Sequence, residues 1–386
     1  MLNIKIAINK YRLFIILFCN FFFAASLNAQ EKVDKGWVLD AFTKEPVAGA
    51  SVFINASGIG TVCDAAGQFS LSKFIQANLG NPNLTIAAVG YETATYNLTT
   101  RTGEVVIYLK PVINELETVV VHAAEKNGWQ KYGADFIENF LGYSDFSKQC
   151  VLKNPEVLSF YYDPELLVLR VVAKKPLLIY NKALGYNITY WLDEFEQNYK
   201  TRIIIFKGSS LFEDRIKAKG RKSQAAKWLK NRTEAYNGSV MHFIRAVYAG
   251  DLAKSGFVVR RLDKVEGYRK GKYTNVVDPK ELAEADFSES ILTDSLTSQK
   301  IIQFTKYLYV LYNKELEELS YLKRQYLFNQ PNPGPQTSIV QLVGTTAVEI
   351  FPNGHIEPAI AFFLEGYWAY EKLDKLLPLD YKAKGE

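Results

Sequence analysis

Short runs of strand-forming residues alternate with turn residues throughout the stretch 36–121. The first run starts at Gly36, and the last is the β-branched run 117–121. About seven such runs, with a turn signal roughly every ten residues, are the pattern expected of a β-sandwich. This stretch is therefore predicted to fold as a small sandwich of about seven strands.

Two turns carry most of this signal. Residues 43–46 end in a proline, which cannot donate a hydrogen bond to a strand ladder. Residues 64–67 end in Gly67, and we predict a hairpin connection there because glycine accepts a positive φ. After this turn, Phe69 and Leu71 occupy alternate positions and are expected to point into the core.

Residues 1–29 have the three parts of a secretory signal peptide. Basic residues precede an apolar run at 13–27, and small residues lead to Ala29, after which cleavage is expected. A retained membrane anchor is the alternative, but the run is shorter than the roughly 20 residues that a spanning helix needs. Asn20 also interrupts it, and Cys19 lacks the small upstream neighbour of a lipidated cysteine. The protein is therefore expected outside the cytoplasm.

The charge balance and the cysteines exclude some classes of protein. The leader contains three of the 46 basic residues and none of the 41 acidic residues, so the mature chain is close to neutral. A near-neutral chain has no excess positive charge to attract nucleic acid, and a leader peptide would take the protein away from it. A nucleic-acid partner is therefore not expected. Cys63 and Cys150 could form one disulfide, but we interpret them as two buried free thiols because they lie in different predicted domains.

The spacing of residues within 34–121 resembles that of a known family. The pattern includes Pro46-x-x-Gly49-Ala50-x-Val52, Gly60-Thr61-x-x-Asp64-x-x-Gly67-x-Phe69 and Val89-Gly90-Tyr91. It resembles the carboxypeptidase regulatory-like domain, and this resemblance implies a transthyretin-like β-sandwich that serves as a non-catalytic accessory module. No catalytic residue is carried over with it.

The same resemblance implies a location. Similar domains precede TonB-dependent outer-membrane receptors and many uncharacterised envelope proteins of Bacteroidetes-type bacteria. At 386 residues, this chain is too short for a receptor barrel of about 22 strands and its plug. The resemblance therefore implies an envelope protein in the periplasm or at the outer-membrane periphery.

Residues 122–386 are predicted to form an α+β domain with an antiparallel sheet. A helix with Trp129, Tyr132, Phe136 and Phe140 on one face is expected to end at Gly142. Another is expected over 220–250, where the buried stripe includes Trp228 and Leu229. Between them, five runs are expected to form an antiparallel meander: 157–162, 166–172, 177–180, 186–195 and 203–206. Further strands are expected at 257–262, 301–312, 339–343 and 347–351, with an exposed connector at 329–335 and an aromatic block from 366.

Several segments of this domain resemble the tail of the same uncharacterised envelope proteins. They are 127–129, 153–158, 181–186, 241–243 and 366–368. The resemblance joins the two domains into one known arrangement and supplies no assigned activity.

A zinc site is the sharpest chemical hypothesis in the sequence. His122 and Glu125 form a His-x-x-Glu pair, and His242 lies farther along the chain, as in metallocarboxypeptidases. We disfavour it because His122 directly follows the last sandwich run, and His242 lies in an apolar helix where core histidines are common. A metallopeptidase domain would also need about 300 residues of alternating strands and helices. No metal, cofactor or catalytic residue is therefore predicted.

A second candidate is the basic run 215–232, which contains no acidic residue. A solvated helix face or loop is the plain interpretation. The functional one is a patch for an anionic membrane surface or acidic glycans. His355 is interpreted as a turn residue.

The function predicted from these observations is a non-catalytic secreted envelope protein that binds or scaffolds a protein or glycan partner. The alternative is an envelope hydrolase, acting on peptides or glycans, with its site in the C-terminal domain. A deep pocket with converging carboxylates would favour the hydrolase.

Overall fold

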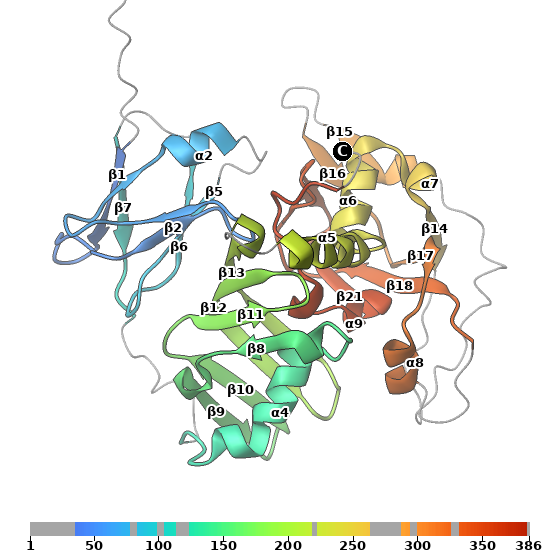
Figure 1. Ribbon diagram of the computed structural model, residues 1–386, viewed down its shortest axis with the longest axis horizontal. Helices are drawn as coiled ribbons and strands as arrows, with labels where there is room; N and C mark the ends of the chain where they lie inside the picture. The colour runs from blue at the N-terminus through green and yellow to red at the C-terminus, as the bar shows by residue number, and fades with distance from the viewer. Residues whose placement is uncertain are drawn as a thin grey trace, which may run out of the picture.

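Three hydrophobic cores organise the chain. A computed structural model describes residues 35–77, 83–98, 104–112, 123–217, 222–262, 287–293, 299–325 and 332–383 (Figure 1). The first core fills an N-terminal β-sandwich, the second lies between a helix and a six-stranded sheet, and the third lies among two four-stranded sheets and a helix. Within these ranges, no helix is long and apolar enough to cross a membrane.

The N-terminal part is a β-sandwich, as predicted. One sheet has the order β4 (Gln68–Ser70), β1 (Lys35–Asp40), β7 (Val105–Leu109), and the other β3 (Gly60–Val62), β2 (Ser51–Phe53), β5 (Asn83–Ala87), β6 (Ala94–Asn97). The core between them includes Val38, Leu71 and Leu84, and Phe69 is also buried as expected. A short helix, α2 (Ser72–Ala77), was not expected. The run 117–121 lies outside the described residues.

The turn at residues 64–67 is not the predicted hairpin. Asp64 Oδ1 accepts hydrogen bonds from the backbone N–H groups of Ala66 (2.9 Å) and Gln68 (2.8 Å). The turn crosses between layers, however, because β3 belongs to one sheet and β4 to the other. Gly67 has φ of +69°, and a Cβ there would lie 2.6 Å from the Val38 carbonyl oxygen, so the turn requires glycine.

The second core lies between α4 (Gly128–Phe140) and a six-stranded sheet. The sheet order is β8 (Cys150–Leu152), β11 (Leu177–Asn181), β12 (Tyr186–Asn198), β10 (Val168–Ala173), β9 (Leu158–Asp163), with β13 (Ile204–Asp214) also paired to β12. The predicted five-strand meander is therefore wrong in order and in number. β12 is long enough to pair with β11 at one end and β10 at the other while β13 covers its opposite edge. The predicted helix is confirmed, with Phe136 and Phe140 fully buried.

The third core lies among helices and two small sheets. Most of its helical residues come from α6 (Val240–Ala249), and α7 (Leu252–Ser255) and α9 (Tyr367–Tyr370) add Leu252 and Trp368. The other helices of this region are α5 (Lys222–Tyr236), which contributes to the second core, and α8 (Leu319–Gln325). One sheet is β14 (Phe257–Leu262), β17 (Tyr307–Leu316), β18 (Pro335–Leu342), β21 (Phe362–Gly366), and the other β15 (Ile291–Thr293), β16 (Lys300–Ile302), β19 (Val348–Ile350), β20 (Ile356–Glu357). Short 3-10 helices lie at Ser147–Gln149, Pro155–Val157, Arg215–Lys217, Phe287–Ser290 and Leu373–Lys375.

Three expectations for this region need correction. The helix over 220–250 is two helices, because Gly238 takes φ of +74° between α5 and α6. Leu229 is 53% exposed and does not belong to the buried stripe, whereas Trp228 is fully buried. The strand at 301–312 is two strands, β16 and β17, in different sheets.

The C-terminal segment 371–383 holds the parts together. Leu377 belongs to the second core, although the preceding helix α9 contributes Trp368 to the third. The Leu379 N–H donates to the Ala56 carbonyl oxygen of the sandwich (2.6 Å). The Ala56 N–H in turn donates to the Ser210 carbonyl oxygen of β13 (2.8 Å). The predicted C-terminal domain, 122–386, thus contains two hydrophobic cores and contacts the sandwich along β13.

Candidate functional site

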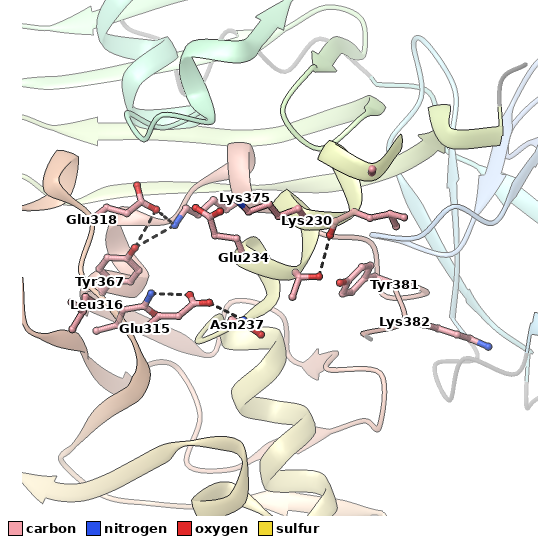
Figure 2. Close-up of a pocket in the computed structure, with 14 residues that line it drawn as sticks. Lys230, Glu234, Asn237, Glu315, Leu316, Glu318, Tyr367, Lys375, Tyr381 and Lys382 are labelled. Atoms are coloured by element: carbon pink, nitrogen blue, oxygen red, sulfur yellow. Dashed lines mark hydrogen bonds and ion pairs between the residues drawn. The ribbon is translucent and has the colours of Figure 1, made fainter. Parts of the chain in front are cut away.

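A cleft of about 1080 Å³ opens between α5, the ends of β17 and β18, and the C-terminal segment (Figure 2). Its polar lining includes Asn237 just after α5, Glu315 near the end of β17, Glu318 between β17 and α8, Gln336 from β18, Tyr367 from α9, and Lys375. The pairing of β17 with β18 shifts register between Tyr312 and Leu316. Such an irregularity redirects the side chains that follow it.

Glu318 is the most heavily hydrogen-bonded group of this lining. Its Oε2 accepts from Tyr370 (2.7 Å) and Ser320 (3.1 Å). Its Oε1 accepts from Tyr367 (3.2 Å) and forms an ion pair with Lys375. Burial raises the pKa of Glu318, but the charge of Lys375 and these hydrogen bonds outweigh burial, so the net pKa lies below its usual value. Glu318 therefore stays ionised and internally satisfied.

Lys375 is buried and shared between two carboxylates. Its Nζ lies 3.4 Å from Glu371 Oε1 and also pairs with Glu318. Its side chain is only 4% exposed, and the pKa of Lys375 is raised because the surrounding negative charge outweighs its burial. Burial raises the pKa of Glu371 to about 7. Buried charges of this kind persist only when they are paired.

Asp374 fastens the C-terminal segment to the end of α4. The Ser144 hydroxyl donates to Asp374 Oδ2, and the Asp374 N–H donates to the Leu141 carbonyl oxygen (2.9 Å). The Asn181 side chain donates to the Asp374 carbonyl oxygen (2.8 Å). Burial raises the pKa of Asp374 to about 6. This group is a structural anchor below the cleft.

Glu315 differs from Glu318, although the two lie three residues apart. Asn237 Nδ2 donates to Glu315 Oε1 (2.7 Å), and Gln336 Nε2 lies 3.5 Å from Oε2. Both partners are neutral amides, and among the described residues no basic side chain forms an ion pair with Glu315. Burial raises the pKa of Glu315, and the charge of Glu234 raises it further. Glu315 is therefore a half-buried acceptor without a counter-ion.

The residues of the zinc hypothesis have other surroundings. The His242 ring stacks on Tyr236 with centroids 4.6 Å apart, and His242 Nδ1 accepts a hydrogen bond from the Gly238 N–H (3.2 Å). Glu125 lies 3.4 Å from Lys131, and His122 is outside the described residues. No group of three or more His, Cys, Asp or Glu side chains that could hold a metal occurs in the described part of the chain.

The basic run 215–232 is not one surface. Arg232 is buried, binds Asp214 through both guanidinium nitrogens (3.0 and 2.8 Å), and lies over the Tyr186 ring. Arg215 packs over the Tyr180 ring. Lys227 and Lys230 of α5 are exposed, and the lysines nearer the start of the run have side chains outside the described set.

Cys63 and Cys150 form no disulfide. Cys63 is buried in the sandwich core, and Cys150 is half-buried beside the second core. Burial raises the pKa of both thiols, that of Cys63 to about 12. The prediction of free thiols is confirmed, although Cys150 is less buried than expected. His355 ends a turn, with its N–H bonded to Asn353 Oδ1 (3.0 Å).

Sequence reasoning singled out none of the carboxylates and amides of the cleft. Glu315 and Glu318 lie in the charged run 314–318, which looks like an ordinary solvated strand end. The one available signal was Lys375, which stands in an apolar aromatic tail where a lysine needs a buried partner.

Comparison with known proteins bears on the sandwich. Residues 35–121 match the family model described as the CarboxypepD_reg-like domain. No curated protein matches the chain. The matched range agrees with the described sandwich strands, β1 to β7. Residues 35–121 of this protein are therefore a carboxypeptidase regulatory-like domain, a generally non-catalytic β-sandwich.

Proposed function

We propose that this chain is a non-catalytic binding protein of the cell envelope, with the cleft beside α5 as its ligand site. The observation that carries the proposal is the internal pairing of the cleft's ionised groups. Glu318 and Lys375 form an ion pair, Lys375 also pairs with Glu371, and Tyr367 and Tyr370 donate to Glu318. Glu318 is ionised and accepts from four donors, so it has neither a free lone pair nor a proton to offer a reacting substrate. It instead gives the cleft a rigid base, which suits binding.

The envelope location rests on the sequence. Residues 1–29 have the composition of a leader, and the domain that follows is of a kind found in accessory modules. The proposed partner is an envelope protein or a glycan.

The rim of the cleft supports a binding role. Leu229 is 53% exposed and Leu316 is 61% exposed, and both line the cleft. Tyr381 lines it as well and is half-buried. Apolar side chains beside convergent polar groups are typical of ligand sites.

A hydrolase is the second candidate, and one specific observation favours it. The pKa of Glu315 is raised by burial, whereas that of Glu318 is lowered in net terms by Lys375. Two carboxylates with pKa values pushed apart are the arrangement of an acid and a base. The binding role is preferred because Glu318 already accepts hydrogen bonds or charge from four donors.

The test is to incubate the full chain with pools of peptides and of envelope glycans. Mass spectrometry then measures cleavage, and equilibrium dialysis measures retention. Retention without cleavage is expected. Cleavage that is lost in Glu315→Gln and kept in Glu165→Gln would overturn the binding role in favour of the hydrolase. Glu165 is a suitable control because it is exposed in the turn between β9 and β10.

A further inference from the structure

One end of the cleft offers hydrogen-bond acceptors with few donors. Glu315 has only amide partners, from Asn237 and Gln336. Lys375 is near enough to lower the pKa of Glu315, but its Nζ is held by Glu318 and Glu371. The negative charge of Glu315 is therefore not neutralised by a direct ion pair from the described part of the protein.

Gln336 lies beside Glu315 in the cleft lining and brings no charge to it. The residue is 6% exposed, and its Nε2 faces Glu315 Oε2 at 3.5 Å. Its Oε1 is buried and packs against Gly238, where an added Cβ would lie 2.1 Å from this oxygen. A ligand in the cleft therefore meets the Glu315 carboxylate and not the Gln336 amide oxygen.

Glu234 of α5 supplies a second acceptor in the cleft lining. It is exposed on α5, and its charge contributes to the raised pKa of Glu315. Figure 2 shows Glu234 and Glu315 on either side of the same opening, with Lys382 at the far end. Two carboxylates that repel each other across an opening are both stabilised when a cation lies between them.

Apolar side chains lie beside these acceptors. Leu229 of α5 and Leu316 of β17 line the cleft and are mostly exposed. Long basic side chains commonly lay their methylene groups on apolar surface while the charged head makes hydrogen bonds. The acceptors and the leucines together match such a side chain.

We propose that this end of the cleft binds a primary ammonium or guanidinium group on an aliphatic stem, presented as a lysine or arginine side chain of a peptide. The inference rests on the proposed binding function and names its ligand class. The cationic head lies between the carboxylates of Glu315 and Glu234, and the stem contacts Leu229 and Leu316. Guanidinium suits the site best, because its fixed fork of donors serves several acceptors at once.

The lysines of the cleft limit the ligand to one basic group. Lys230 lies one helical turn before Glu234, and Lys382 lies in the C-terminal segment. Both are exposed and would repel further cations. A peptide with a single basic residue should therefore bind at least as well as oligolysine.

The test is isothermal titration of the full chain with the peptide acetyl-Ala-Arg-Ala-amide. The matched peptide with norleucine in place of arginine keeps the stem and removes the charge. We expect the norleucine peptide to bind about tenfold more weakly, since hydrogen bonds to charged groups are the stronger ones. Glu315→Gln should weaken binding of the arginine peptide by about the same factor, and Glu165→Gln should not. Free n-pentylammonium is the small-molecule arm, and weaker binding of it than of the peptide supports a peptide source.

Several outcomes would overturn the inference. Equal affinity for the arginine and norleucine peptides, or no binding of either, refutes the cationic ligand. If Glu315→Gln has the denaturation midpoint of the wild type and binds the arginine peptide equally well, the cationic head does not bind at Glu315. A neutral glycan or peptide that is retained without cleavage would leave the proposed binding function intact while these titrations fail. Cleavage dependent on Glu315 would refute the binding function itself.

Discussion

Phe53 of the sandwich stacks on Trp191 of the six-stranded sheet, with ring centroids 4.5 Å apart and an interplanar angle of 21°. Phe53 is 0% exposed but is not part of the sandwich core. Its burial therefore comes from the contact between the sandwich and the sheet. This makes the regulatory-like domain an integral part of the molecule, because a mobile appendage would leave Phe53 in water.

Replacing Phe53 should therefore reveal the strength of this contact. We expect Phe53→Ala to lower the free energy of unfolding by about 3 kcal/mol, because a buried ring is lost and a cavity remains. Urea denaturation measures the change. Val62→Ala in the same sandwich is the control, since Val62 is 61% exposed and should change stability by less than about 0.5 kcal/mol. Equal effects of the two substitutions would show that the Phe53–Trp191 contact contributes little.

Arg232 should behave as a structural residue. It donates to Asp214 and to the backbone carbonyl oxygens of Leu184 (2.8 Å) and Gly185 (3.3 Å). We expect Arg232→Met to cost about 3 kcal/mol of unfolding free energy, because Asp214 loses its partner and two carbonyl groups lose a donor. Thermal or urea denaturation measures this. Lys227→Met, on the exposed face of the same helix, should have almost no effect, and a similar loss there would argue against the buried role of Arg232.

The buried Glu371 should make stability depend on pH. Its folded pKa is raised to about 7, so the folded state holds a proton that the unfolded state has already released at intermediate pH. Stability contributed by the protonated form is therefore lost as pH rises through this range. The charged groups around Glu371 are Lys375, Glu318 and Asp374.

Glu371→Gln mimics the protonated form and tests this sign. The wild type should lose stability as pH rises, and the variant should not. The unfolding free energy of Glu371→Gln, relative to that of the wild type, should therefore increase by about 2 kcal/mol as pH is raised from about 5 to about 8. Chemical denaturation at a series of pH values measures the difference. For the control Glu165→Gln, the difference in unfolding free energy from the wild type should not change over the same pH range. If the stability of Glu371→Gln relative to the wild type increased as pH fell, the raised pKa of Glu371 would be contradicted.

The two thiols should resist alkylation in the folded protein. Burial raises the pKa of Cys63 to about 12 and raises that of Cys150 as well, so little thiolate is present at neutral pH. We expect iodoacetamide to modify the peptides containing Cys63 and Cys150 only after denaturation, as read by mass spectrometry. Cys150 is half-buried and should react before Cys63. Rapid labelling of native Cys63 would contradict this, and a disulfide between the two peptides would contradict the free thiols.

The sandwich was predictable because its signals are local. At the turns, proline fixes φ and glycine accepts a positive φ, and residues such as Phe69 and Leu71 show a period of two. The layer to which each strand belongs was not predictable. β3 and β4 flank a tight turn like the strands of a hairpin, yet β3 pairs with the preceding strand β2 in one sheet and β4 pairs with β1 in the other. Such pairings depend on the whole sandwich.

The helices of the C-terminal part were predictable for the same local reason, and the sheet order was not. Phe136 and Phe140 repeat at helical spacing and are buried where the pattern expects. Leu229 fits the same pattern and is exposed. Helical periodicity cannot distinguish a residue facing a core from one facing a cleft, because both lie on the apolar side of the helix.

The sequence by itself determined the regulatory-like sandwich, its turns and the alternation of helix and strand behind it, since these depend on near neighbours along the chain. Only the tertiary structure decided the cleft. Asn237, Glu315, Gln336 and Lys375 come from the turn after α5, two strands and the C-terminal segment, and each has an ordinary sequence context. Their chemistry arises from burial and from charges brought together in space, and neither can be read from the order of residues.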